Sequence, residues 1–235
     1  MITLKLNGKE VQGEEGQYIL EVARKYGVDI PTLCYHEALE PAGMCRLCTV
    51  ELFDGRKTRF VTACNYPIWE GMEVNTDTEA VHKGRKLIVE LLLARCPDVQ
   101  VIKELAAQYD IKEPRFKKED DDCILCGLCV RICERMGNSA LGLTGRGVEM
   151  KVDTPFHIQT DVCMGCGACA FVCPTGAIIL EDIKSFRKLD TWHTQLELAR
   201  CKGCGNEFAT LATLKHIKEK IELPEEVFEF CSACR

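Results

Sequence analysis

The amino-acid sequence predicts an α+β protein built from several small modules around metal-binding cysteines. Three observations carry this prediction: the chain has 235 residues, it has 17 cysteines, and most of these cysteines lie in short runs with two residues between successive cysteines. A chain of this length is expected to form one or two ordinary domains. Smaller modules bury little apolar surface, and metal ligation can supply the stability that they lack. We therefore expect several small modules that are each stabilised by a metal centre.

Residues 1–78 are expected to form the first module. Apolar and polar side chains alternate at the start of the chain, and Asn7-Gly8 is a strong turn signal for a hairpin over 1–16. A helical pattern over 18–26 ends at Gly27. A long cysteine-bearing loop follows, and further strands are predicted at 49–53 and 59–62. Hairpin, helix, loop and strands is the order of a β-grasp ferredoxin.

Residues 79–118 are expected to form a helical linker. Apolar residues recur at helical spacing on both sides of Cys96-Pro97, and Pro97 is suited to open a second helix. The mixed-charge run over 117–122 is interpreted as a solvated connector.

Residues 119–180 contain an internal repeat of two cysteine quartets, forty residues apart. Both quartets have the Cys-x2-Cys-x2-Cys-x3-Cys spacing of bacterial two-cluster ferredoxins, in which the fourth cysteine of each run serves the other cluster. Pro174 follows the second run as expected, whereas Glu134 follows the first. The pattern predicts a dicluster [4Fe–4S] ferredoxin with Cys123, Cys126, Cys129 and Cys173 on one cluster and Cys163, Cys166, Cys169 and Cys133 on the other.

The first module carries its own four cysteines, spaced as Cys34-x10-Cys45-x2-Cys48-x15-Cys64. Four thiolates complete a [2Fe–2S] centre, and small residues before Cys45 let the backbone fold closely over it. His36 follows Cys34 as in half of a Rieske pair, but the other half is absent, so His36 is interpreted as a loop histidine.

Three strings around these cysteines carry a family resemblance: PTLCYH, GMCRLCTVEL and TACNYPIWEGMEVNTDTEAV. They resemble the N-terminal ferredoxin of the large iron–sulfur subunit of complex I. They are equally similar to the iron–sulfur (diaphorase) subunit of NAD-linked bidirectional hydrogenases. The resemblance covers about residues 1–180 and implies that one [2Fe–2S] cluster is ligated by Cys34, Cys45, Cys48 and Cys64.

One departure from this resemblance concerns the linker. The resembled subunits usually carry a further His-x3-Cys-x2-Cys-x5-Cys site there, where this sequence offers only His82 and Cys96. We therefore expect that cluster to be missing. Cys96 is interpreted as a buried free thiol, as isolated cysteines commonly are.

Residues 181–235 are expected to form a small zinc-ribbon-like tail with a bound metal. Two pairs, Cys201-x2-Cys204 and Cys231-x2-Cys234, flank a predicted helix. Four thiolates can close a tetrahedral site, and structural zinc is the first interpretation. A further iron–sulfur cluster is the open alternative. The apolar residues of the helix are Phe208, Leu211, Leu214, Ile217 and Ile221.

Composition restricts the classes of partner and compartment. The formal net charge is −6 and no basic residues cluster, which argues against a nucleic-acid partner. No apolar run reaches the roughly 18 residues of a membrane span. Without a signal peptide, an odd number of closely spaced cysteines indicates metal sites in a reducing compartment rather than disulfides. We therefore expect a cytoplasmic protein.

The sequence contains no phosphate-binding glycine loop and no nucleophile–base set, so no catalytic residues are predicted. The expected function is that of a non-catalytic electron-transfer subunit of a cytoplasmic multisubunit oxidoreductase. It would relay electrons between a flavoprotein NAD(P)H-oxidising subunit and a catalytic subunit such as a hydrogenase. Alternative catalytic partners are a formate dehydrogenase, another molybdenum or tungsten enzyme, or an electron-bifurcating complex. An iron–sulfur sensor or zinc-ribbon regulator is the hypothesis from another class.

Overall fold

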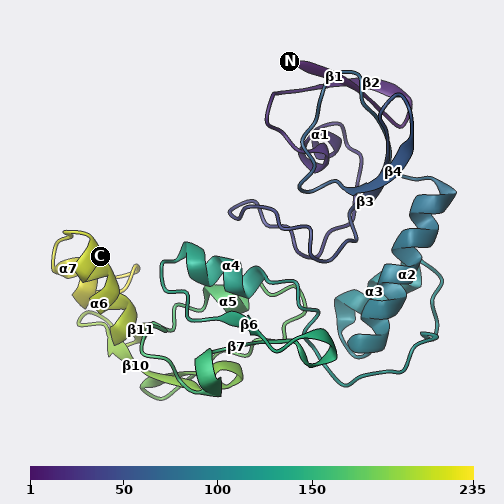
Figure 1. Cartoon of the computed structure of the whole chain (residues 1–235). Coiled ribbons are helices and arrows are strands. Elements are labelled where there is room, and N and C mark those ends of the chain that lie inside the picture. The colour runs from purple at the N-terminus through teal and green to yellow at the C-terminus, as the bar shows by residue number, and fades with distance from the viewer. The chain divides into compact units, whose positions relative to one another are not determined.

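The computed structural model describes all 235 residues, and the chain divides into two compact units, Met1–Cys126 and Gly127–Arg235 (Figure 1). The division falls inside the first cysteine quartet of the internal repeat. None of the helices combines the length and the apolar character that a membrane-spanning helix requires.

A five-stranded sheet with strand order β2-β1-β5-β3-β4 forms the framework of the first unit. The predicted hairpin is confirmed: β1 and β2 pair in antiparallel fashion, and Asn7 and Gly8 both have the positive φ that a tight hairpin turn requires. The central strand β5 pairs parallel to β1 and was not predicted, because it is only three residues long. The strand bounds are β1 Ile2–Leu6, β2 Lys9–Gly13, β3 Thr49–Phe53, β4 Thr58–Thr62 and β5 Glu73–Asn75.

The helix α1 (Ile19–Lys25) packs its apolar face onto this sheet, in the region expected from the sequence (Figure 1). Ile19, Leu20 and Val22 are buried in the same cluster as the inward side chains of the strands. The Tyr18 N–H donates to the Glu21 carboxylate at 2.7 Å, which caps the first turn. Burial of this face fixes where the chain enters the cysteine-bearing loop.

Two helices follow, α2 (Glu79–Arg95) and α3 (Gln100–Gln108), as the periodicity predicts. The buried Arg85 donates through Nε and Nη2 to the Thr49 carbonyl at 3.1 and 2.9 Å, which fastens α2 to β3. The prediction that Pro97 opens the second helix is wrong. Cys96, with φ −125° and ψ 68°, lies outside the helical region, which is disfavoured for the residue before a proline. A turn separates Pro97 from α3, which begins at Gln100.

The internal repeat of the sequence appears in the second unit as two matching helix starts. Gly127 precedes α4 (Leu128–Arg135) with φ 69°, and Gly167 precedes α5 (Ala168–Phe171) with φ 79°. Glycine adopts this left-handed backbone more easily than other residues. In both runs the glycine directly follows the second cysteine, so the two helices begin at equivalent positions of the repeat. In the sequence between the two helices, the short strands β6 (Gly142–Thr144) and β7 (Lys151–Asp153) form an antiparallel pair.

The tail contains a four-stranded antiparallel sheet, of order β11-β10-β9-β8, that the sequence analysis did not predict. The predicted helix is confirmed as α6 (Leu211–Lys220), although Phe208 lies in a strand and Ile221 follows the helix end. The remaining bounds are β8 Glu181–Ile183, β9 Phe186–Leu189, β10 Thr194–Arg200, β11 Glu207–Thr210 and α7 Glu226–Glu229.

Candidate metal centres

The four cysteines of the first module lie in the loop before β3 and just after β4. Cys34, Cys48 and Cys64 are each 1% exposed, and Cys45 is half-buried. The Cys45 N–H donates to Cys34 Sγ at 3.4 Å, and the Thr49 side of the loop is closed by the hydrogen bond from Thr49 N–H to the Arg46 carbonyl at 3.2 Å. The fold of the loop thus turns the thiols inward, away from solvent.

These thiols interact as two pairs. A hydrogen bond from the Cys34 thiol lowers the pKa of Cys45 to about 6, against the opposing effect of burial, and the same bond raises the pKa of Cys34. In the second pair, a hydrogen bond with Cys64 lowers the pKa of Cys48, while the pKa of Cys64 is raised. Backbone N–H groups of Leu47 and Ala63 also favour the thiolates. Two pairs of cysteine sulfurs with N–H donors beside them fit the donor set of a [2Fe–2S] cluster.

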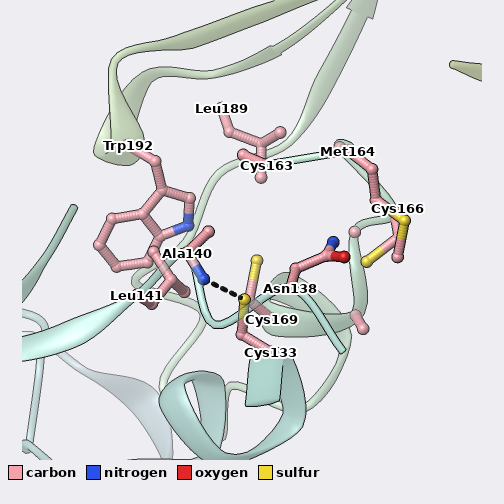
Figure 2. A pocket seen from close by; sticks show the side chains of 13 residues that line it. Cys133, Asn138, Ala140, Leu141, Cys163, Met164, Cys166, Cys169, Leu189 and Trp192 are labelled. Atoms are coloured by element: carbon pink, nitrogen blue, oxygen red, sulfur yellow. Dashed lines mark hydrogen bonds between the residues drawn. The ribbon is translucent and has the colours of Figure 1, made fainter. Parts of the chain in front are cut away.

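In the second unit, four cysteines line one small cavity of about 20 Å³, which is partly open to solvent (Figure 2). Three of them come from the second quartet, and the fourth, Cys133, closes the first quartet. The spacing predicts this grouping of Cys133 with the second quartet. The cysteines that line the cavity are Cys133, Cys163, Cys166 and Cys169.

The environment of this cavity combines burial with directed donors. The Ala140 N–H donates to Cys133 Sγ at 3.2 Å (Figure 2). Burial raises the pKa of Cys163, and it raises the pKa of Cys169 to about 11. Without a cation these thiols hold their protons at neutral pH, so a bound metal would have to displace them. The apolar walls and the sulfur-directed N–H group suit an iron–sulfur cluster.

The other predicted [4Fe–4S] ligands are divided between the two units. Cys126 is buried and Cys123 half-buried in the first unit. In the second unit, Cys129 belongs to the buried apolar cluster, and Cys173 packs against that cluster.

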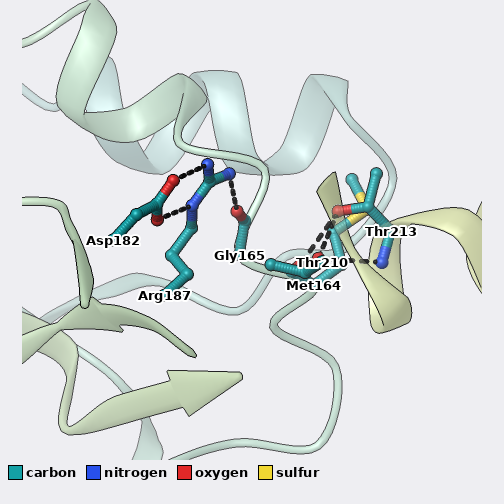
Figure 3. A network of polar contacts seen from close by, with 6 residues as sticks. All are labelled: Met164, Gly165, Asp182, Arg187, Thr210 and Thr213. Atoms are coloured by element: carbon teal, nitrogen blue, oxygen red, sulfur yellow. Dashed lines mark hydrogen bonds and ion pairs between the residues drawn. The ribbon is translucent and has the colours of Figure 1, made fainter. Parts of the chain in front are cut away.

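The tail holds the loop between Cys163 and Cys166 through its two backbone carbonyls (Figure 3). Arg187 Nη1 donates to the Gly165 carbonyl at 3.0 Å, and the same guanidinium is held by both carboxylate oxygens of Asp182 at 2.7 and 2.8 Å. The hydroxyls of Thr210 and Thr213 both donate to the Met164 carbonyl, Thr213 at 2.9 Å. The sequence analysis missed these residues, which belong to no motif.

The four cysteines of the tail come together as predicted. Their sulfurs all lie within 4.8 Å of one another, and Cys204 Sγ and Cys231 Sγ are 3.8 Å apart. A tetrahedral metal ion with bonds of about 2.3 Å to sulfur separates its ligands by roughly 3.8 Å. The spacing therefore fits one metal ion. A multi-iron cluster would hold its thiolates further apart, because they bind different irons.

Backbone donors prepare this tail site for a cation. N–H groups of Cys204 and Cys231 lower the pKa of Cys201 to about 6, and the Cys231 N–H lies 3.3 Å from Cys201 Sγ. A hydrogen bond with Cys231 contributes most to raising the pKa of Cys234 to about 12. A Cβ at position 203 would lie only 3.1 Å from Cys234 Sγ, so glycine lets the backbone approach the sulfur closely. The donor set and its close backbone fit a structural metal.

The remaining residues named from the sequence lie apart from these centres. His36 Nδ1 accepts a hydrogen bond from the Ala38 N–H at 3.1 Å. His82 contacts Asp77 at 2.7 Å, and its ring lies 5.7 Å from that of Tyr109. Cys96 is fully buried, and burial raises its pKa to about 12. His82 and Cys96 are separated by most of α2, or about 20 Å at 1.5 Å per residue, so they cannot share one cluster.

The fold and the cysteine sites define an iron–sulfur protein of the ferredoxin type. Residues 1–79 match the family described as 2Fe-2S iron-sulfur cluster binding domain, and residues 117–180 match the family described as 4Fe-4S dicluster domain. Proteins similar to the chain include subunits of an NADPH-Fe(3+) oxidoreductase, of an NADP-reducing hydrogenase and of NADH-ubiquinone oxidoreductase. The family resemblance seen in the sequence is thereby confirmed.

Individual relatives agree with this assignment. NADPH-Fe(3+) oxidoreductase subunit alpha of Geobacter sulfurreducens is 32% identical over 212 residues, which are 78% of this chain and 24% of the relative. NADP-reducing hydrogenase subunit HndD of Solidesulfovibrio fructosivorans is 32% identical over 215 residues, or 77% of this chain and 36% of the relative. The chain thus spans about a quarter to a third of the length of these relatives.

A solved structure of an NAD+-reducing [NiFe]-hydrogenase in the H2-reduced state is also similar. Its TM-score is 0.59 with 28% sequence identity, over 66% of this chain and 75% of that chain. The similarity therefore covers most of the hydrogenase chain, in contrast to the partial coverage of the longer relatives.

Proposed function

We propose that this chain relays single electrons between an NAD(P)H-oxidising flavoprotein and a catalytic subunit of a cytoplasmic multisubunit oxidoreductase. The observation that carries the proposal is the cavity shared by Cys133, Cys163, Cys166 and Cys169, within a chain that matches 2Fe-2S and 4Fe-4S domain families and is similar to NAD(P)-linked hydrogenases. Iron–sulfur clusters supply one-electron redox chemistry, whereas the polypeptide orders and tunes them.

The ligand sets proposed for the clusters follow the predicted cysteine groups. The paired thiols of the first module are assigned to a [2Fe–2S] cluster, supported by their burial and by the N–H groups directed at sulfur. The cavity of the second unit is assigned to a [4Fe–4S] cluster. The second [4Fe–4S] cluster is assigned to Cys123, Cys126, Cys129 and Cys173 on the strength of the repeat.

For the tail we propose one structural zinc ion on Cys201, Cys204, Cys231 and Cys234. The 4.8 Å limit on the sulfur separations supports a single ion over a further cluster. Since zinc has no redox chemistry, the tail would anchor the Cys163–Cys166 loop rather than carry electrons. Metal analysis of the anaerobically purified chain tests this assignment. About ten irons and one zinc per chain are expected, whereas twelve or more irons without zinc would contradict it.

A hydrogenase is the catalytic partner that the similarities favour. Two of the similar proteins are NAD(P)-linked hydrogenases by name. A formate dehydrogenase or another molybdenum or tungsten enzyme is the second candidate that the sequence left open, and one similar protein, NADPH-Fe(3+) oxidoreductase subunit alpha, is not a hydrogenase by name. The metals of the purified native complex separate the two: nickel supports a hydrogenase, and molybdenum or tungsten overturns it.

The relay role is tested by electron delivery. The chain contains no phosphate-binding glycine loop, so NADH should reduce its clusters only when a flavoprotein partner is added. Bleaching of the visible iron–sulfur absorption after mixing with NADH measures this step. Rapid bleaching of the isolated chain by NADH would contradict the proposal.

A further inference from the structure

We propose that the indole N–H of Trp192 donates a hydrogen bond to a sulfur of the cluster held by Cys133, Cys163, Cys166 and Cys169. Trp192 would thereby raise the reduction potential of that cluster. The inference rests on the proposed function, because it requires a cluster in this cavity. It assigns to the tail a part in electron transfer that its cysteines alone do not suggest.

Trp192 forms one wall of the cavity, although it lies outside both cysteine quartets. Its side chain is 3% exposed, and it lines the same cavity as the four cysteines. In Figure 2 the indole nitrogen faces the interior of the cavity. Nε1 has no hydrogen-bond partner among the atoms of the protein. Buried N–H groups almost always have a partner, so this donor points to an acceptor that the cavity receives.

Sulfur is the acceptor that this position offers. Asn138 is the one other polar side chain of the lining, and it accepts no hydrogen bond from the indole. The remaining side chains are apolar and include Leu141, Met164 and Leu189. Cys169 is one of the four cysteines that line this cavity together with Trp192. A cysteinyl sulfur or an inorganic sulfide of the cluster would satisfy this donor.

The backbone of the tail holds the indole in place. The buried Thr194 hydroxyl donates to the Trp192 carbonyl at 2.9 Å. Leu189, which is 1% exposed, belongs with Trp192 to the apolar cluster of the unit. His193, between Trp192 and Thr194, turns the chain with φ 52°. A donor fixed in this way needs no rearrangement to reach the cluster, which is the condition for a strong influence on its potential.

The consequence for electron transfer follows from charge. Reduction adds one negative charge to the cluster, and a hydrogen bond to sulfur stabilises the more negative state. Removal of the donor should therefore lower the reduction potential. At a fixed potential we expect the ratio of reduced to oxidised cluster to fall by up to roughly tenfold, which corresponds to 59 mV for a one-electron couple.

The test is an EPR-monitored redox titration of the full-length protein with all its clusters, comparing the native chain with Trp192→Phe. Phenylalanine keeps most of the apolar wall and removes only the donor. Trp69→Phe is the matched control, because Trp69 packs against the core of the first unit. Cys166→Ser identifies the signal of this cluster. A lower midpoint in Trp192→Phe alone is expected, and unchanged midpoints would overturn the inference.

A second measurement requires no variant at Trp192. In the Trp69→Phe protein with 15N-labelled tryptophan, Trp192 is the sole labelled indole. Electron–nuclear double resonance of the reduced cluster should show coupling to an exchangeable proton and to this nitrogen. Absence of both couplings in a protein with full iron and sulfide content overturns the role of Trp192 alone. A missing cluster, seen as low iron, overturns the proposed function as well.

Discussion

Nη2 of Arg95 lies 2.6 Å from Oδ2 of Asp121, and this ion pair holds both backbone groups of Cys123. Nε of the same guanidinium donates to the Cys123 carbonyl at 2.7 Å, and Asp121 Oδ1 accepts from the Cys123 N–H at 2.8 Å. The end of α2 therefore sets the backbone of the first cysteine in the dicluster run.

Substitution of Arg95→Met should loosen this cysteine. The apolar chain keeps its volume, but the Cys123 carbonyl and Asp121 lose their donor, at a cost of about 1–2 kcal/mol. We expect faster iron loss from the variant under a chelator, measured as the decay of iron–sulfur absorption. Lys103→Met is the control, because its pair with Asp98 is exposed and contributes little. Equal rates of decay in the two variants would contradict this role of Arg95.

Arg187 should be irreplaceable by lysine. Its planar guanidinium binds Asp182 with two bonds and the Gly165 carbonyl with a third, and a lysine ammonium cannot reproduce that geometry. We expect Arg187→Lys to destabilise the second unit by about 1–3 kcal/mol and to accelerate oxygen damage of one [4Fe–4S] signal. EPR after timed air exposure measures the effect. Arg200→Lys, at an exposed pair with Glu207, should behave as the native protein.

Zinc binding to the tail should release protons and weaken as the pH falls. The pKa of Cys201 is lowered to about 6, so at pH 7 this thiol is already largely ionised, whereas the raised pKa of Cys234, about 12, keeps that thiol protonated. A bound cation must displace the Cys234 proton. Calorimetric titration in buffers of different ionisation enthalpy counts the protons. The same affinity at pH 6 and pH 8 would count against a thiolate site.

The stability of the first unit should depend on Glu90 at low pH. Hydrogen bonds from Arg115 lower the pKa of Glu90 from 4.5 to about 2. A carboxyl with a lowered pKa in the folded state contributes its full stabilisation above about 4.5, and the contribution is lost as the pH falls towards 2. Glu90→Gln should therefore flatten acid unfolding between these values, measured by circular dichroism. Glu104→Gln, on the exposed side of α3, should leave the profile unchanged.

Local patterns were enough to predict much of this fold. Alternation with Asn7-Gly8 predicted the first hairpin, and helical spacing predicted α1, α2 and α6. The cysteine spacings predicted which thiols lie together in the cavity and in the tail, including the place of Cys133 beside the second quartet. Each of these signals lies within a few neighbouring residues or in a repeated run.

The parts that were not predicted depend on contacts between distant residues. Arg187 meets Gly165 across 22 positions, and Thr213 meets Met164 across 49. Neither pair is part of a recurring sequence pattern. In a sequence, a single threonine or arginine cannot be told apart from an ordinary surface residue. The same holds for Trp192, whose importance depends on the cavity that it lines. The strand β5 was missed because three residues are too few to show an alternation.

The walls of the cavity in Figure 2 are completed late in synthesis. Its walls include Cys133 and Trp192, which leave the ribosome at widely separated times. A nascent chain that has already exposed every cysteine of both quartets still lacks the indole and Leu189 that shield them. Iron delivered at that stage would bind cysteines that are still exposed to water. We therefore expect iron to be inserted after translation of the tail. A chain truncated before Leu189 and Trp192 would have the four cysteines but not the apolar walls of the cavity.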